Sequence, residues 1–176
     1  MNRIADFSKV NSAIFTEEAQ KSLGLEEAEA IKVYTDIKLP ERATSGSAGY
    51  DFYVPADISL APGETVRIPT GIRARMDEGW VLMIFPRSGL GIKYRLTLDN
   101  TVGVIDSDYY YSDNEGHIMI KVTNCSGIGK DEGKTVELKK GQGFAQGVFL
   151  PFGITTDDEA TGVRNGGFGS TTKVMT

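Results

Sequence analysis

Short apolar runs separated by turn signals constrain the fold of this chain more than any other feature. The 176 residues include 21 glycines and 6 prolines, and clusters of glycine, asparagine or aspartate bound most apolar runs. Runs of this kind predict β-strands joined by tight turns. The clearest are at 66–72, 80–85, 117–122 and 144–152. We therefore expect an all-β fold.

The first part of the chain differs in composition from the rest. An acidic, alanine-rich segment follows Thr16, which is a candidate helix N-cap with two glutamates behind it. We predict a helical N-terminal extension at 1–30, a β domain at 31–160 and a glycine-rich C-terminal arm at 161–176. Apolar and polar residues alternate from Ile31, which predicts a strand there.

Composition excludes several kinds of chemistry. His117 is the only histidine and Cys125 the only cysteine, so a His/Cys zinc site and a Ser-His-Asp triad are not expected. We interpret His117 as a solvated or structural residue and not as a catalytic one. A formal net charge of −5 opposes binding to extended nucleic acid. With no leader or long apolar span evident, we expect a soluble, cytoplasmic protein that does not bind membranes.

An acid stands where one predicted strand ends. The sequence Gly-Val-Ile at 103–105 runs directly into Asp106, followed closely by Asp108 and Tyr109. A carboxylate held at the mouth of an apolar strand is a good candidate for a general base. Asp106 is the first candidate, and Asp108 is a rival because strand alternation directs it to the same face.

Two segments have the composition of anion-binding sites. Arg87, Ser88 and Gly89 follow the predicted strand at 80–85, where a guanidinium, a hydroxyl and exposed amides suit phosphate oxygens. An ordinary turn explains them equally well. Arg164 and Phe168 lie in a glycine-rich C-terminal segment that is no P-loop but fits a closing arm. A disordered tail is the alternative there.

Two amide side chains are further candidates. Gln146 lies inside a strand-like run, where a buried amide needs partners. Asn100 precedes the strand of Asp106 and presents both a donor and an acceptor. Each also has a purely structural explanation. Gln146 fits a core residue whose hydrogen bonds are all made, and Asn100 fits a residue that forms a turn.

The order of these segments resembles one known family. Residues 48–51, 86–90, 100–109, 145–146 and 166–171 resemble the five ordered motifs of the trimeric deoxyuridine triphosphate nucleotidohydrolases, the dUTPases. The resemblance implies a distorted β jelly-roll subunit and a homotrimer that shares its active sites. It also implies hydrolysis of dUTP to dUMP and pyrophosphate, which keeps uracil out of DNA, with Mg²⁺ carried by the triphosphate.

The resemblance also implies a role for each matching residue. Asp106 corresponds to the aspartate that activates water, and Tyr109 to the ring beneath deoxyribose. Asp51 corresponds to an acid that reaches Mg²⁺ through water, with no direct metal ligand in the chain. Uracil binding falls to Asn100, Val104, Ile105 and Met119; phosphate binding to Arg87, Ser88, Gly89 and Gln146; the closing arm to Arg164, Phe168, Gly169 and Ser170.

The chain departs from the family pattern at three places. Six residues separate Tyr109 from Gly116, where the family passes almost directly to glycine. Arg164 stands one residue closer to Phe168 than the pattern has it, and the N-terminal extension is additional. A protein partner that binds the extension or the insert after Tyr109 is an open possibility.

Two rival functions fit parts of the sequence. A dCTP deaminase shares the fold and the phosphate-binding logic but requires a glutamate where this chain has residues 118–121. The second rival is a nucleotide-sensing or protein-binding module, which would bind its ligand without hydrolysing it. Release of ammonia from dCTP would reveal the first, and a pull-down with and without dUTP the second.

Overall fold

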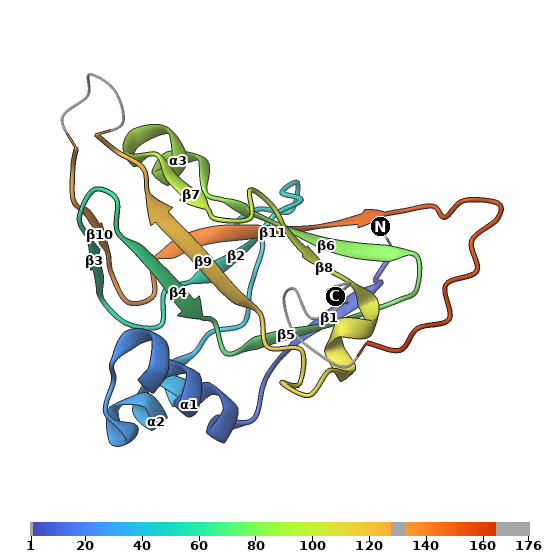
Figure 1. The fold of residues 1–176 in the computed structure, drawn as a ribbon, viewed down its shortest axis with the longest axis horizontal. Coiled ribbons are helices and arrows are strands. Elements are labelled where there is room, and N and C mark those ends of the chain that lie inside the picture. The colour runs from blue at the N-terminus through green and yellow to red at the C-terminus, as the bar shows by residue number, and fades with distance from the viewer. Residues whose placement is uncertain (1, 128–132, 165–176) are drawn as a thin grey trace, which may run out of the picture.

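The computed structural model describes residues 2–127 and 133–164. Within them the strands form antiparallel sheets around one main core, a jelly-roll-like all-β fold (Figure 1). The largest sheet has the order β2 (Tyr50–Tyr53), β11 (Gly143–Pro151), β6 (Trp80–Pro86), β8 (Gly103–Ile105). A second has the order β4 (Thr65–Pro69), β9 (Met119–Asn124), β7 (Leu96–Leu98). Two pairs complete the set: β1 (Ala5–Lys9) with β5 (Ile72–Met76), and β3 (Ile58–Leu60) with β10 (Val136–Leu138).

The strands predicted at 66–72, 80–85, 117–122 and 144–152 are found, and the first of them is divided in two. Alternation buries Leu82 and Ile84 of β6 and Ile120 and Val122 of β9 in the main core. The run at 66–72, expected as one strand, is split between β4 and β5. Gly71 has φ +71°, a conformation that L side chains rarely adopt, so the chain turns there.

The N-terminal helices are confirmed, but the strand expected from Ile31 is wrong. The helices are α1 (Ser12–Leu23) and α2 (Glu27–Asp36), so α2 continues past residue 30. Ala30 and Val33 are buried against α1 in a second small core, while Ile31 is 47% exposed. Spacing of three residues between buried positions is helical, and the alternation around Ile31 was too short to outweigh it.

The start of the chain differs from the prediction in two further ways. β1 pairs with β5 from Ala5 opposite Met76 to Lys9 opposite Ile72, so the extension contains a strand as well as helices. Asn11, not Thr16, caps α1, because its side-chain oxygen accepts from the Ala13 amide at 2.9 Å. The division into three regions at residues 30 and 160 remains a prediction.

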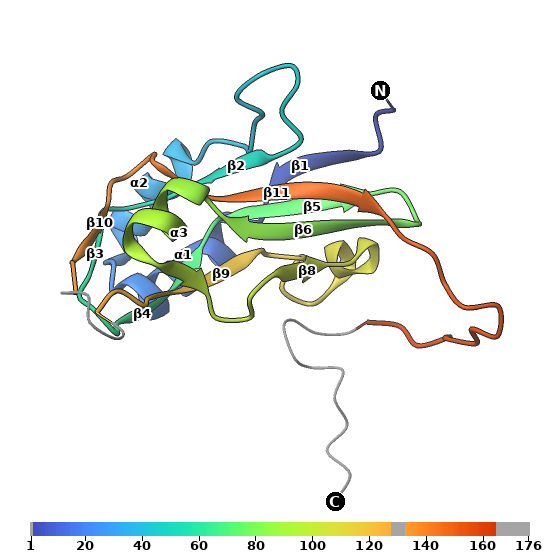
Figure 2. The same ribbon diagram turned by 90° about the horizontal axis from the view of Figure 1, so that it is seen from above.

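Two short helical segments flank the large sheet. α3 (Ser88–Tyr94) follows β6, and the 3-10 helix η1 (Ser107–Tyr111) follows β8. After β11 the chain leaves the body of the molecule and turns back toward η1 (Figures 1 and 2). The described helices are all too short or too polar to cross a bilayer. Cytoplasmic location stays a prediction.

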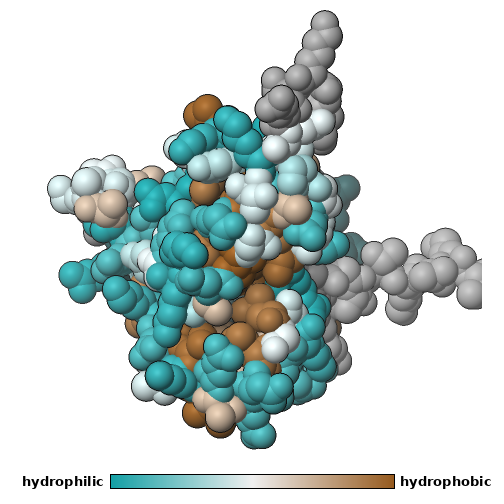
Figure 3. Space-filling view, turned by 90° about the vertical axis from the view of Figure 1, so that its left-hand side faces the viewer, coloured by the Kyte–Doolittle hydropathy of each residue, from teal (hydrophilic) through white to brown (hydrophobic). Residues whose placement is uncertain are grey.

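The main core reaches the surface at one end of the molecule. Figure 3 shows apolar side chains at the centre of this end, surrounded by hydrophilic ones. Ile58 and Val66 are only partly buried, and they line a shallow cleft of about 370 Å³ beside Leu25. The helices therefore cover this end of the core incompletely.

His117 is a buried structural residue, so of the two alternatives left open by the sequence the solvated one is wrong. It has no exposed surface, and its Nε2 accepts a hydrogen bond from the Gly71 amide at 2.9 Å. The Phe15 ring of α1 lies 6.4 Å from its ring. Burial, with a smaller contribution from Arg67, lowers the pKa of His117 to about 4.

The stability of the fold should therefore depend on pH through His117. Since its folded pKa lies below the unfolded value near 6.5, only the unfolded chain takes up this proton between the two values. The free energy of unfolding should fall as pH drops from about 6.5 to about 4, by about 3 kcal/mol in all. Urea unfolding between pH 7.5 and pH 5 measures this, above the range where most carboxylates titrate.

The matched control is His117→Gln, which offers a side-chain acceptor to Gly71 but cannot titrate. Its unfolding free energy should change little between pH 6.5 and pH 5, whatever its absolute stability. Equal slopes for the two proteins over this range would contradict the assignment.

Candidate active site

One group of predicted residues meets where β2, β6 and β11 lie side by side. Gln146 of β11 stands opposite Asp51 of β2 and Phe85 of β6. Arg87 follows β6 directly, and its Nη1 lies 3.2 Å from Asp51 Oδ2. The carboxylate is mostly buried, whereas the guanidinium is 45% exposed. Asp51 thus holds Arg87 in place while leaving it accessible to an anion.

Two glycines make room for these side chains. A Cβ at Gly49 would lie 2.6 Å from Gln146 Oε1, and a Cβ at Gly143 would lie 2.6 Å from Arg87 Nη1. Sequence reasoning missed both as residues of the site, although a glycine inside or next to a strand signals close approach of another group. Ser88 and Gly89 begin α3 beside Arg87. The structure brings these residues together, and their role in binding an oxyanion stays a prediction.

Asp106 stands at the opposite end of the large sheet. It follows β8 and precedes η1, and its side chain is 43% exposed. Arg164 Nη2 donates to Asp106 Oδ2, and Arg164 Nε donates to Asp108 Oδ1 at 2.9 Å. The two acids therefore face the same side, as predicted, but through a 3-10 turn and not through strand alternation.

Tyr109 is held beneath this ion-paired group. Only 3% of the residue is exposed, and the Arg164 guanidinium carbon lies 6.0 Å from the ring centre. The hydroxyl donates to the His117 carbonyl at 2.8 Å and accepts from Asn114 Nδ2 at 2.9 Å. Burial raises the pKa of Tyr109, although the Asn114 bond and Arg164 oppose it. Sequence reasoning missed Asn114, because an asparagine in a polar turn carries no distinguishing signal.

The residues expected at a base-binding hairpin lie in two sheets. β8, with Val104 and Ile105, pairs with β6, whereas β9, which begins at Met119, pairs with β4 and β7. The Val104 side chain is half exposed and that of Ile105 lies in the core, so any ligand contact of Ile105 is through its backbone. Asn100 is exposed in the turn before β8. Phe168, Gly169 and Ser170 lie outside the described residues.

The sheet register separates the two groups within one chain. Ile105 stands opposite Leu82, so Asp106 aligns with Val81, six residues before Arg87. At a rise of 3.3 Å per residue, Asp106 and Arg87 are about 20 Å apart along the strands. A single chain therefore does not bring Arg87 to the candidate base.

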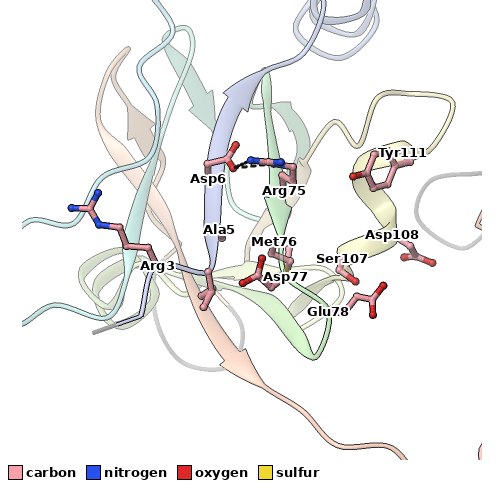
Figure 4. Close-up of a pocket in the computed structure, with 11 residues that line it drawn as sticks. Arg3, Ala5, Asp6, Arg75, Met76, Asp77, Glu78, Ser107, Asp108 and Tyr111 are labelled. Carbon is pink, nitrogen blue, oxygen red and sulfur yellow. Dashed lines mark hydrogen bonds and ion pairs between the residues drawn. The ribbon is translucent and has the colours of Figure 1, made fainter.

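An acidic cleft lies beside Asp108. It has a volume of about 610 Å³ between β1, β5 and η1, and its acids include Asp6, Asp77 and Glu78 (Figure 4). Arg75 reaches into it but pairs with Asp6 at 2.8 Å. Because carboxylates dominate the polar lining, the cleft repels a phosphate chain, which instead suits the opposite end of the sheet.

The described residues contain no group of three histidine, cysteine, aspartate or glutamate side chains arranged to hold a metal ion. Mg²⁺ takes oxygen ligands and keeps several waters, commonly bound through one or two carboxylates and substrate phosphates. Asp51, with 17% of its side chain exposed beside Arg87, offers one such carboxylate. The residues present fit a cation that arrives with a phosphate ligand.

The chain is similar to proteins of one family over most of its length. The family model described as dUTPase matches residues 35–172. The deoxyuridine 5'-triphosphate nucleotidohydrolase of Lactococcus lactis subsp. lactis (strain IL1403) is 46% identical over 138 residues, covering 77% of this chain and 88% of that protein. The protein of the same name from Escherichia coli O9:H4 (strain HS) is 40% identical over 146 residues, covering 78% and 89%.

Solved structures agree with these relatives. The dUTPase from Streptococcus mutans has a TM-score of 0.58 and 42% identity, covering 66% of this chain and 88% of that one. The dUTPase from phage phi11 of S. aureus has a TM-score of 0.61 at 19% identity, covering 91% and 97%, and is similar in fold alone. A mutant of that phage enzyme coordinates a structural Mg(II) ion. On the match to residues 35–172 and on these identities, the chain belongs to the dUTPase family.

Proposed function

We propose that this enzyme hydrolyses dUTP to dUMP and pyrophosphate. Its membership of the dUTPase family supports the reaction, and its relatives carry the name deoxyuridine 5'-triphosphate nucleotidohydrolase. The observation that carries the proposal is the position of Asp106, a half-exposed carboxylate paired with Arg164, whose guanidinium carbon lies 6.0 Å from the Tyr109 ring centre. A carboxylate, a sugar-sized ring and a cation are thus adjacent.

Asp106 acts as the general base in the proposed mechanism. Its carboxylate orients a water molecule and accepts its proton as the oxygen attacks the α-phosphorus of dUTP, and pyrophosphate leaves. Arg87, Ser88, Gly89 and Gln146 bind phosphate oxygens. Mg²⁺ carried by the triphosphate would neutralise charge on these oxygens, and Asp51 would hold it through water.

Binding of dUTP also affects the ion pairs that Arg164 makes with the two carboxylates. In the free chain the Arg164 guanidinium binds both Asp106 and Asp108, so it occupies the carboxylate that must contact water. A triphosphate offers Arg164 stronger partners, since phosphates carry more negative charge than one carboxylate. Binding of dUTP therefore draws Arg164 away and frees Asp106 for water.

The base and sugar are recognised on the other side of Asp106. Tyr109 packs under deoxyribose, where a 2′-hydroxyl would collide with its ring. Asn100 and the backbone of Val104, Ile105 and Met119 bind uracil, and Arg164, Phe168, Gly169 and Ser170 close over the ligand. Fixed donors and acceptors that pair with uracil are left unpaired by cytosine, which is a strong basis for rejection.

The active site is assembled from several chains of a homotrimer. About 20 Å separates Asp106 from Arg87 along the strands of one chain, too far for both to contact one triphosphate. A second copy that supplies Arg87 to the Asp106 of its neighbour removes this gap. The chain acts in the cytoplasm, binds neither nucleic acid nor membrane, and leaves its N-terminal extension free for a regulatory partner.

Substrate choice tests the function directly. Pyrophosphate release measured with Mg²⁺ should be fast with dUTP and at least about a hundredfold slower in kcat/KM with dCTP, dTTP and UTP, because each places an unpaired group or a steric clash in the pocket. A rate on dCTP comparable to that on dUTP would refute the proposal, and release of ammonia from dCTP would identify a deaminase.

The role of Asp106 is tested by replacing its carboxylate with an amide of the same shape. Asp106→Asn should lower kcat by about 10²- to 10⁴-fold, because it removes the base and leaves the shape of the site. Binding of a non-hydrolysable dUTP analogue should be retained. Asp108→Asn is the matched control and should keep most of the activity; near-normal turnover by Asp106→Asn would show that the base is elsewhere.

Sharing of sites between chains is tested by mixing two inactive variants. Asp106→Asn and Arg87→Ala should each be inactive, but co-expression should restore activity, since some sites receive an intact Asp106 and an intact Arg87 from different chains. Random assembly restores roughly a quarter of the sites. Mixed oligomers that stay inactive would place both residues of a site in one chain.

A further inference from the structure

The two unusual segments of this chain contact each other. The N-terminal arm (residues 2–36) lies almost entirely before the residues that match the dUTPase family model, and the insert (residues 110–115) separates Tyr109 from Gly116. The Asn11 amide, at the start of α1, donates to Glu115 Oε2 at 2.7 Å. A bond between residues 104 positions apart shows that the arm and the insert form one unit.

Asn114 joins this unit to the Tyr109 ring. Its Nδ2 donates to the Tyr109 hydroxyl at 2.9 Å, while its Oδ1 accepts from Ser112 Oγ at 3.0 Å and from the Gly116 amide at 3.2 Å. The single hydroxyl hydrogen of Ser112 is shared between Asn114 Oδ1 and the Tyr109 carbonyl, which lies 2.6 Å from Ser112 Oγ. The insert is therefore hydrogen-bonded to both the backbone carbonyl and the phenol hydroxyl of Tyr109.

The Tyr109 hydroxyl has its donor and an acceptor site occupied. It donates to the His117 carbonyl at 2.8 Å and accepts from Asn114. With 3% of the residue exposed, the ring has little room to rotate or to slide along its plane. The height of this ring below a bound sugar thus depends on Asn114 and His117.

Glu115 ties the insert to the body of the protein. It has φ +57°, a conformation that few residues other than glycine adopt, so tertiary contacts must stabilise it. Besides the Asn11 bond, its carboxylate lies 3.8 Å from Arg73 Nη1. Arg73 in turn donates to the Tyr110 carbonyl at 2.6 Å and stacks 3.6 Å from the Tyr110 ring centre.

The arm is itself anchored beside the same residues. β1 pairs with β5, and the Val10 amide donates to the Gly71 carbonyl at 3.0 Å. Phe15 is fully buried and packs against His117, whose carbonyl holds the Tyr109 hydroxyl. The arm therefore reaches Tyr109 by two routes, through Glu115 and Asn114 and through His117.

We propose that Asn114 is a positioning residue for sugar discrimination and that Glu115 couples it to the N-terminal arm. The inference rests on the proposed function, in which the Tyr109 ring excludes a 2′-hydroxyl. Because Asn114 and the His117 carbonyl both bind the Tyr109 hydroxyl, the ring cannot move away from a bound ribose. The steric clash between the ring and the 2′-hydroxyl is therefore retained. A ring released by loss of Asn114 can move and admit UTP.

The test measures kcat/KM for dUTP and UTP in the full chain. Asn114→Asp keeps the acceptors for Ser112 and Gly116 but removes the donor to Tyr109. It should lower the dUTP/UTP ratio on the order of five- to tenfold, the size of one hydrogen bond, chiefly by raising the rate with UTP. Asn114→Ala should act in the same direction if the aspartate variant folds poorly.

A double-mutant cycle shows whether Asn114 acts through Tyr109. Tyr109→Phe removes the hydroxyl and should lower the ratio by itself. Adding Asn114→Asp to Tyr109→Phe should then change the ratio by less than about twofold, since the shared bond is already gone. Independent effects that multiply would overturn the proposed route.

Two further variants separate positioning from general stability. Asp113→Ala changes an exposed neighbour in the same insert and should leave the ratio as in the parent. Glu115→Ala should lower the ratio, whereas Glu115→Gln, which can still accept from Asn11, should restore most of it. An unchanged ratio in Glu115→Ala would remove the arm from the proposal.

The outcomes distinguish this inference from the function on which it rests. If the parent protein does not prefer dUTP, the proposed function fails. If the parent prefers dUTP and Asn114→Asp keeps the same ratio, with both activities equally reduced or intact, the function stands and Asn114 has no positioning role.

Discussion

The pairing of β6 with both β11 and β8 determines where Arg87, Gln146 and Asp106 lie relative to one another. Backbone hydrogen bonds fix β6 against Gln146 on one side and against Ile105 on the other, so the register allows no other placement of Arg87 and Asp106. A slip of one residue would turn the buried Leu82 and Ile84 toward the opposite face. The core thus enforces the geometry of the site, including its division between two ends of the sheet.

The buried polar groups near His117 show how the rest of the site is stiffened. His117 Nε2 accepts from the Gly71 amide, and the Tyr109 hydroxyl joins the His117 carbonyl to Asn114, while His117 Nδ1 is buried with no partner among the described residues. Buried polar groups are costly when unpaired, so a connected set favours one arrangement over its neighbours. The Phe15 ring packs against His117 and covers it with apolar surface. The N-terminal helices are therefore linked through His117 to Tyr109.

Sequence reasoning succeeded where local pattern and final environment agree. Alternation placed β6 and β11, and the acid after residues 103–105 does lie at a strand end. It failed at Ile31, where a short alternation competed with the helical spacing of Ala30 and Val33. It also missed β1, whose strand conformation depends on β5, and Asn114, whose role depends on a phenol folded back onto it. Partners distant in sequence leave no local signal.

The sequence by itself determined the kind of fold and the identity of the chemistry, because strand periodicity, turn residues and the order of five short motifs are written in neighbouring residues. Only the tertiary structure decided how these parts combine. It placed Arg87 and Asp106 at opposite ends of one sheet, closed Arg164 onto two carboxylates, and joined Asn11 to Glu115. Each of these depends on contacts between residues far apart in the chain, whose geometry arises only when the core packs.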